Sequence, residues 1–443
     1  MYAQMVVQAD RACGQRVSRA GAASGILPSA GSPTWPRRPS RARTLPHPFA
    51  STVRPHARTG VTPMRPMLKP GLARLRRDEL TLQFGTVRRY ARLVEQADAA
   101  VAAFLDLVDG TRDTPELLAA GERLGLDPGL GRALLDSLAD GELLDDAEAL
   151  ARALEGFPQP QREVLGPDAA GLSLVHPEPG EAAEVIAARR RARVEVRGAG
   201  RVGAALAAVL SAGGIGAVTV ADGGRVEPGD CSPAGIPPTD VGRLRSTAAR
   251  EAVLRAAAAA PAERHRPAPV AAGLPALVVL APRDGAGAWT GRAVEAHELA
   301  RSGVPHLYVG VLEHLGVVGP LVVPGSSACG GCAALTRADE DEGWPGLLAQ
   351  LEGTGAGPAR RPACDSALAT AVAGLAALHA QLFLDGVLPP SVDGWCELSA
   401  ADGMVRRLRL PAHPSCGCQW PGGRPPLAVP GAGACSGAGR GGT

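Results

Sequence analysis

The segment 193–222, RVEVRGAGRVGAALAAVLSAGGIGAVTVAD, constrains the fold of this chain more than any other feature. It reads as an apolar strand, three closely spaced glycines, a helix rich in Ala and Leu, and a second strand that ends on an acid. In nucleotide-binding folds such glycines make a tight turn, admit a phosphate and allow close helix packing, and the acid meets a ribose hydroxyl. We therefore interpret Gly198, Gly200, Gly203 and Asp222 as cofactor-binding residues. The alternative is an α/β crossover in which the glycines serve packing alone.

Apolar segments continue to alternate with helical ones after this unit. LPALVVLAP at 274–282 and VPHLYVGVLE at 304–313 read as strands, and a helical stretch lies around 291–302. Strands that alternate with helices imply a mostly parallel, doubly wound sheet. The predicted fold class is α/β, with such a sheet preceded by a small winged-helix-like module.

Residues 67–165 are predicted to form this module. A first helix ends at Gly110, a second begins with Thr114 as its N-cap, and a third begins at Asp127, the last two caps each being followed by proline. The segment 141–144 reads as a strand that follows the third helix. Helix, helix-turn-helix and strand is a winged-helix pattern, which in many proteins binds DNA.

The local charge of the module opposes DNA binding. Between Asp98 and Glu148 the sequence has thirteen acidic residues and three arginines, whereas a surface that follows phosphates needs the opposite sign. Two interpretations remain open. The module is either a helical packing unit, or a peptide-binding unit that accepts an extended segment along an exposed strand edge.

Two short cysteine pairs lie far apart in the sequence. Cys329 and Cys332 form a CxxC pair, and Cys416 and Cys418 form a CxC pair. Two tight thiolate pairs on Gly-containing turns suit a closed tetrahedral zinc site that joins distant segments. A redox-active CxxC pair and unligated thiols are the alternatives, and His413 is expected to be a loop histidine, although it could replace one sulfur. The other five cysteines, most of which are expected to be buried or incidental, are Cys13, Cys231, Cys364, Cys396 and Cys435.

Composition adds limits on location and partners. The nine cysteines make an odd number, and residues 1–20 lack the apolar core of a secretory signal. We therefore expect a reducing, cytoplasmic location. The formal net charge of +2 gives no reason to expect nucleic acid or a membrane as partner. We also expect no run of the roughly 18–20 uncharged apolar residues that a membrane span requires.

The two ends of the chain are expected to lie outside the folded part. Residues 1–66 contain ten arginines and one acid, with no apolar periodicity. This segment is a disordered basic tail, a transit-like segment, or the result of a start assigned too early, with Met64 or Met67 as the true start. Residues 421–443 are predicted to form a disordered tail.

The glycine loop, the turn into Asp222, the TDVG sequence at 239–242 and the two cysteine pairs together resemble the ThiF and ubiquitin-activating family, over about residues 190–420. The resemblance implies a domain that binds ATP with magnesium, adenylates a carboxylate, holds a structural zinc and often pairs as a homodimer. With the preceding module, the chain further resembles actinobacterial proteins that bind the leader of a ribosomally made peptide during azole or azoline formation. This second resemblance rests on the order of the parts and on stretches such as LLDSLADGELLDD and HPSCGC.

The chain departs from the family pattern at several ATP-site positions. An Asn-Leu-Asn-Arg-Gln run is expected after the ribose acid, but residues 227–233 read EPGDCSP, and the chain contains no asparagine. The family lysine that touches the phosphates falls on Arg245, and the acid that helps place magnesium falls on Asp284. Arginine keeps the charge of lysine without its point-donor geometry. Losing several such groups should cost many orders of magnitude in phosphoryl chemistry.

Two functions follow from these departures. The first is a binding scaffold that captures a precursor peptide and presents it to a separate ATP-dependent enzyme. The second is an active adenylyltransferase in which Arg245 and Asp284 act as catalytic residues. An NAD-dependent oxidoreductase would fit the glycines but not the cysteine pairs.

Overall fold

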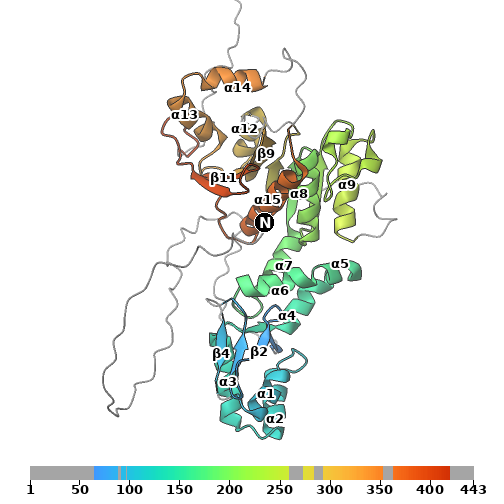
Figure 1. The fold of residues 1–443 in the computed structure, drawn as a ribbon, viewed down its shortest axis with the longest axis vertical. Coiled ribbons are helices and arrows are strands. Elements are labelled where there is room, and N and C mark those ends of the chain that lie inside the picture. The colour runs from blue at the N-terminus through green and yellow to red at the C-terminus, as the bar shows by residue number, and fades with distance from the viewer. Residues whose placement is uncertain are drawn as a thin grey trace, which may run out of the picture. The chain divides into compact units, whose positions relative to one another are not determined.

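The structure is a computed structural model that describes residues 64–87, 91–95, 97–258, 273–283, 293–352 and 363–419 (Figure 1). Its largest element is a seven-stranded sheet with the order β12-β11-β10-β9-β8-β6-β7. Strands β7, β6, β8 and β9 are parallel, and β9 to β12 are antiparallel. The strands are β6 (Arg193–Arg197), β7 (Ala217–Ala221), β8 (Leu277–Leu280), β9 (His306–Leu312), β10 (Leu315–Val322), β11 (Gly394–Ser399) and β12 (Val405–Arg409).

Helices cover this sheet and complete its core. The helices of this part are α8 (Arg201–Ala212), α9 (Arg245–Ala256), α12 (Ala293–Arg301), α13 (Gly330–Glu340), α14 (Trp344–Glu352) and α15 (Ser366–Leu384). Helix α8 packs against both α9 and α15, and α15 packs on β9 and β10. Every residue of β8 is buried, as expected for a strand covered on both faces. The predicted α/β class is confirmed, with a parallel part formed by β7, β6, β8 and β9, to which β10, β11 and β12 add in antiparallel order. Elements β8, β9 and α12 lie within the segments predicted from the sequence.

Helix α15 corrects one expectation. Its 19 residues, with a mean hydropathy of 1.7, make it long and apolar enough to cross a membrane by length and composition. The expectation that the chain holds no such run was therefore wrong. Half of the apolar window is buried, and residues such as Val372, Ala376 and Phe383 belong to the main hydrophobic core. The apolar character of α15 thus has an explanation in packing between the sheet and α8.

The N-terminal module has a small sheet before its helices. Strands β2 (Arg74–Arg76), β3 (Leu82–Phe84) and β4 (Arg92–Val94) form a three-stranded antiparallel sheet in sequence order. Helices α1 (Ala99–Asp106), α2 (Thr114–Arg123) and α3 (Pro128–Asp140) follow, and β1 (Pro66–Leu68) pairs with β5 (Leu144–Asp146). Leu82, Phe84 and Phe104 lie in the common core of the sheet and helices. The three-stranded sheet is an addition to the predicted pattern, and the winged-helix assignment stays a prediction.

Local boundaries in the module differ slightly from the sequence prediction. The N-cap of α2 is Asp113 rather than Thr114, because the Asp113 carboxylate accepts the Glu116 amide in a reciprocal capping box. Asp127 caps α3 as predicted. The segment 141–144 was predicted as a strand, but the chain turns there and β5 begins at Leu144, since Glu142 adopts a positive φ of 59°.

Four helices connect the module to the large sheet. They are α4 (Ala147–Glu155), α5 (Gln159–Val164), α6 (Gly166–Val175) and α7 (Glu181–Arg191). On α7, Arg189 donates from Nε and Nη2 to the two carboxylate oxygens of Asp385, at 2.8 and 2.6 Å. Of the segment 1–66, expected to lie outside the folded part, residues 1–63 are outside the described residues, whereas Pro66 begins β1. The predicted tail at 421–443 also lies outside the described residues.

Candidate functional site

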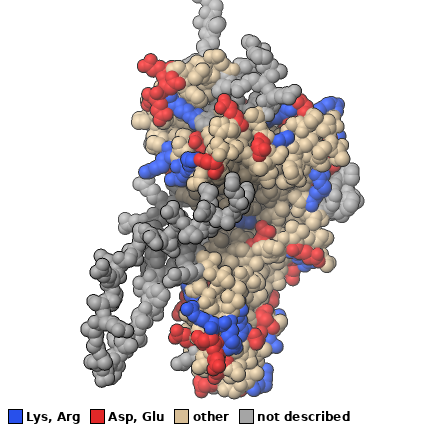
Figure 2. All heavy atoms as spheres, viewed as in Figure 1, with Lys and Arg blue, Asp and Glu red and all other residues tan. Residues whose placement is uncertain are grey.

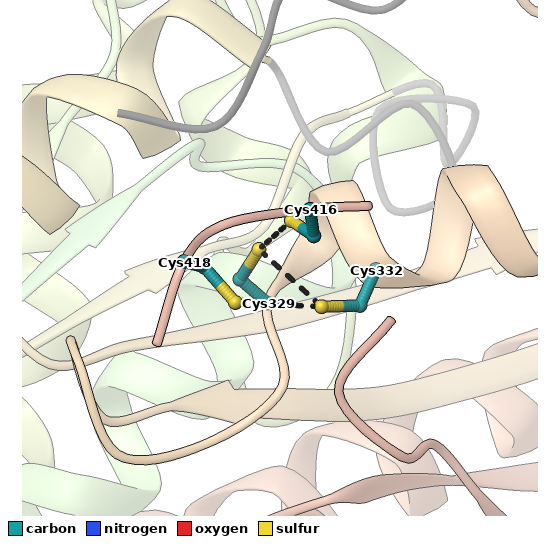
Figure 3. A group of neighbouring side chains, drawn as sticks. All are labelled: Cys329, Cys332, Cys416 and Cys418. Carbon is teal, nitrogen blue, oxygen red and sulfur yellow. Dashed lines mark hydrogen bonds between the residues drawn. The ribbon is translucent and has the colours of Figure 1, made fainter. Parts of the chain in front are cut away.

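The four predicted metal-ligating cysteines lie together (Figure 3). Cys329 precedes α13, Cys332 lies in its first turn, and Cys416 and Cys418 come from the loop after β12. All four Sγ atoms lie within 4.8 Å of one another. The Cys329 Sγ atom is 3.5 Å from that of Cys416 and 4.0 Å from that of Cys332, and the Cys332 and Cys418 sulfurs are 3.4 Å apart.

This geometry fits a tetrahedral metal centre. A zinc ion with Zn–S bonds of about 2.3 Å places its sulfur ligands roughly 3.8 Å apart, close to the spacings between these atoms. Cys329, Cys332 and Cys416 are buried, and as thiolates at such distances these groups would need a cation to balance their charge. Gly417 adopts a φ of 70°, a turn that suits glycine between the two ligands of the CxC pair. The four residues therefore form a candidate closed metal site.

His413 supports this site without joining the four-sulfur cluster. Its Nε2 atom lies 2.9 Å from Asp339 Oδ2, and its Nδ1 atom accepts the Ser415 amide at 3.2 Å. The His413 carbonyl also accepts the Cys416 amide at 3.0 Å. The histidine thus shapes the turn that carries Cys416 and ties it to α13, rather than replacing a sulfur.

The glycine loop between β6 and α8 makes very close contacts with its own chain. Gly198 has a φ of 110°, and a Cβ atom there would lie 2.0 Å from the Ala281 carbonyl oxygen. A Cβ atom on Gly203 would lie 2.1 Å from the Gly198 carbonyl oxygen. Both positions therefore require glycine for turn geometry and helix packing, whether or not a nucleotide binds. The cofactor-binding role of Gly198, Gly200 and Gly203 stays a prediction.

Asp222 lies at the end of β7 beside this loop, as predicted. Its Oδ2 accepts the Ala199 amide at 2.9 Å, and its Oδ1 accepts the Gly224 amide at 2.9 Å and Arg245 Nε at 2.8 Å. Burial alone would raise the pKa of Asp222, but these backbone bonds and the guanidinium hold the pKa below its ordinary value. Asp222 thus accepts three hydrogen bonds within the chain, of the roughly four that a carboxylate can accept, and its cofactor-binding role stays a prediction.

Arg245, expected to touch phosphates, is bonded within the chain. It begins α9, and besides Asp222 its Nη1 donates to the Arg225 carbonyl at 2.7 Å and lies 3.5 Å from Asp230 Oδ2. Its side chain is 13% exposed. The structure thus brings Arg245 and Asp222 together as an ion pair, and a catalytic role for Arg245 stays a prediction. Asp284, the other predicted catalytic residue, lies outside the described residues.

A cavity of about 520 Å³ opens at the N-terminus of α8. A charged group that the sequence interpretation missed, Arg283, comes from the carboxyl end of β8, next to the predicted Asp284. The sequence could have indicated Arg283 by its position after a predicted strand, because ligand sites of such sheets lie beyond the carboxyl ends of the strands. The residues that line the cavity are Gly200, Arg201, Val202, Gly203, Glu227, Pro228, Gly229, Asp230, Ala281, Pro282, Arg283, Val311 and Cys364.

Comparison with known proteins supports the family resemblance. A model of the ThiF family matches residues 181–271, which include α7, β6, the glycine loop, α8, β7 and α9. The search of curated proteins found no match. The resemblance to the ThiF family inferred from the sequence is confirmed.

Solved structures show the same fold at low identity. The structure of E. coli MccB with succinimide matches with a TM-score of 0.56 and 14% identity, covering 80% of this chain and 98% of MccB. The microcin C7 biosynthetic enzyme MccB in complex with N-formylated MccA matches with a TM-score of 0.54 and 14% identity, covering 80% and 99%. PaaA matches with a TM-score of 0.53 and 17% identity, covering 77% and 98%. These neighbours are matched over nearly their full lengths, and one MccB structure contains ATP.

Proposed function

We propose that this chain, which carries a ThiF-like domain, captures the leader of a ribosomal precursor peptide and presents it to a separate ATP-dependent enzyme for heterocycle formation. In this proposal residues 67–165 are the peptide-binding module, and about residues 190–420 are the ThiF-like domain. The leader peptide and the partner enzyme bind the chain in the cytoplasm. A homodimer through the ThiF-like domain is part of the same proposal.

The observation that carries this proposal is the edge of the three-stranded sheet in the module. Among the residues that the structure describes, strand β4 pairs with β3 alone and lies at the end of the sheet order β2-β3-β4. An edge strand presents unpaired backbone groups to which an extended peptide can add. Arg92 of β4 lies 3.6 Å from Glu142, which places this edge beside the turn that follows α3.

The side chains near this edge suit a peptide with apolar and basic residues. Leu93 on β4 is 47% exposed. Glu142, which Arg92 of β4 contacts, is also exposed. Apolar side chains give register, and acidic ones attract a cationic segment. Figure 2 shows acidic and basic side chains interspersed on the visible face of the module, unlike the continuous basic surface that nucleic acid would require.

Neighbouring structures give further support to peptide binding. MccB has been solved with N-formylated MccA and with MccA-N7isoASN. MccB binds these ligands. That this chain binds a ligand of the same class is part of our proposal. The proposal that the heterocycle formed is an azole or azoline rests on the sequence resemblance.

The internally paired Asp222 and Arg245 favour a scaffold over an adenylating enzyme. Adenylation depends on charged groups aimed at the phosphates, whereas Arg245 is directed to Asp222 and Arg225. The alternative, an active adenylyltransferase, requires Arg245 to leave Asp222 and Asp284 to place magnesium. In either case we assign the four-cysteine cluster a structural zinc that joins α13 to the loop after β12.

A matched pair of substitutions tests the peptide-binding edge. Leu75 on β2 and Leu93 on β4 both lie opposite Gln83, and they are 43% and 47% exposed. We expect a precursor peptide encoded beside this gene to bind the full chain with a Kd of about 1 μM or lower. Leu93→Ala should raise this Kd roughly 2–5-fold, because a cross-strand contact is lost, while Leu75→Ala should not.

Fluorescence anisotropy with the labelled peptide measures both Kd values. A larger effect of Leu75→Ala would assign binding to the opposite edge. If no such peptide binds the full chain, the proposed function is wrong.

A further inference from the structure

The cavity at the N-terminus of α8 holds an arginine between two carboxylates. Arg283 Nε donates to Asp230 Oδ1 at 2.5 Å, and Arg283 Nη2 donates to Glu227 Oε2. Asp230 is 1% exposed, whereas the Glu227 side chain is 61% exposed. The guanidinium therefore bridges a buried carboxylate and one at the mouth of the cavity.

Asp230 is the centre of a continuous chain of charges. Besides Arg283, it accepts the Glu227 amide at 2.8 Å and faces Arg245 at 3.5 Å. Arg245 in turn bonds Asp222, so that two guanidinium groups alternate with three carboxylates. A carboxylate as buried as Asp230 is stable only when its charge is balanced. Here the balancing cations belong to the chain itself.

Arg283 lies directly beside the glycine loop, where a nucleotide phosphate would bind. A Cβ atom built on Gly200 would lie 3.3 Å from both Cα and Cγ of Arg283. Gly200 precedes the first turn of α8, whose amides form the anion-binding end of the helix. A nucleotide at such a site brings a divalent cation that is bound by carboxylate oxygens and phosphates. Of the described residues that line the cavity, Asp230 and Glu227 carry carboxylates, and both are bonded to Arg283.

We infer that Arg283 is a built-in counterion that holds the place of a divalent cation between Asp230 and Glu227, so that the cavity does not accept a magnesium-bound nucleotide. This role is independent of the proposed peptide binding, which uses the module. Arg283 also joins the loop between β7 and α9 to the end of β8. The residue that determines the ligand class of the cavity is thus Arg283.

Reversing the charge of Arg283 tests this inference. In zinc-loaded full-length protein, Arg283→Asp places three carboxylates together and should bind one Mn²⁺ per chain, measured as loss of the free-ion signal in electron paramagnetic resonance. The unaltered chain should bind no Mn²⁺ in the cavity. Its affinity for ATP, measured by calorimetry, should be undetectable or the same with Mg²⁺ as with EDTA, whereas Arg283→Asp should bind ATP at least tenfold more tightly with Mg²⁺.

Two further variants keep the test decisive. Arg283→Gln removes the positive charge of the guanidinium without adding a negative charge, and this variant should also gain Mn²⁺ binding. It replaces Arg283→Asp if that variant does not fold. Arg243 bonds Asp240 and Glu251 outside the cavity, and Arg243→Gln should gain no Mg²⁺-dependent ATP binding. The inference is wrong if the unaltered chain binds ATP at least tenfold more tightly with Mg²⁺, or if a folded Arg283 variant gains no Mn²⁺ binding. Peptide binding should be unchanged in every variant.

Discussion

Cys416→Ser is expected to release the metal from the four-cysteine cluster and to lower the melting temperature by roughly 10 °C or more. Cys416 is 1% exposed, and its Sγ lies 3.5 Å from that of Cys329. In a closed structural site the binding energy of the metal is folding energy. The cluster joins α13 to the loop after β12, so that losing one ligand should loosen both segments.

Metal analysis and thermal unfolding of the full chain measure this effect. Cys231→Ser is the matched control, because Cys231 is a partly exposed thiol outside the cluster and should keep both metal and melting temperature. One zinc per chain is expected in protein prepared without chelator. A full chain that contains no zinc, or a Cys416→Ser variant that keeps it, would refute the metal site.

Asp385→Ala should destabilise the chain by about 3–5 kcal/mol, because it leaves the buried charge of Arg189 without its carboxylate. The side chains of Arg189 and Asp385 are only 7% and 2% exposed. The remaining hydrogen bond, from Arg189 Nη1 to the Gly213 carbonyl at 3.3 Å, brings no negative charge, and Asp168 interacts with Arg189 only through the electrostatic field. The pair ties α7 to the end of α15, so the loss should appear as global unfolding at lower denaturant concentration.

Two variants separate this effect from a general loss of ion pairs. Asp402→Ala removes the partner of Arg406 in an exposed pair and should leave the unfolding midpoint unchanged. The double variant Arg189→Met with Asp385→Leu should recover much of the loss, since an apolar pair needs no charge balance. Equal midpoints for Asp385→Ala and the unaltered chain would show that the pair is not required for stability.

The features that were predictable from sequence have strong local signals. The order of strand, glycines, helix and acid specifies the β6–α8–β7 unit, because period and turn residues agree there. The spacing of the cysteine pairs likewise predicted a cluster that the fold assembles from segments 84 residues apart, from Cys332 to Cys416.

The missed features depend on tertiary contacts. Strands β2, β3 and β4 have three residues each, too short for an alternating pattern to be recognised. Helix α15 is uncharged because it is packed in the core, which hydropathy alone cannot distinguish from a membrane span. Arg283 gains its role from Asp230 and Glu227, which lie more than fifty residues away in the sequence and are brought to it only by the parallel order of β7, β6 and β8.

The central claim is that this chain binds a precursor peptide without activating a carboxylate itself. ATP–pyrophosphate exchange by the full chain, with zinc bound and Mg²⁺ present, tests it most directly when measured with and without saturating peptide. We expect exchange to stay at background in both conditions, while anisotropy in the same sample shows the peptide bound. Rapid exchange that requires the peptide and is abolished by Arg245→Ala would contradict the claim and identify the chain as an active adenylyltransferase.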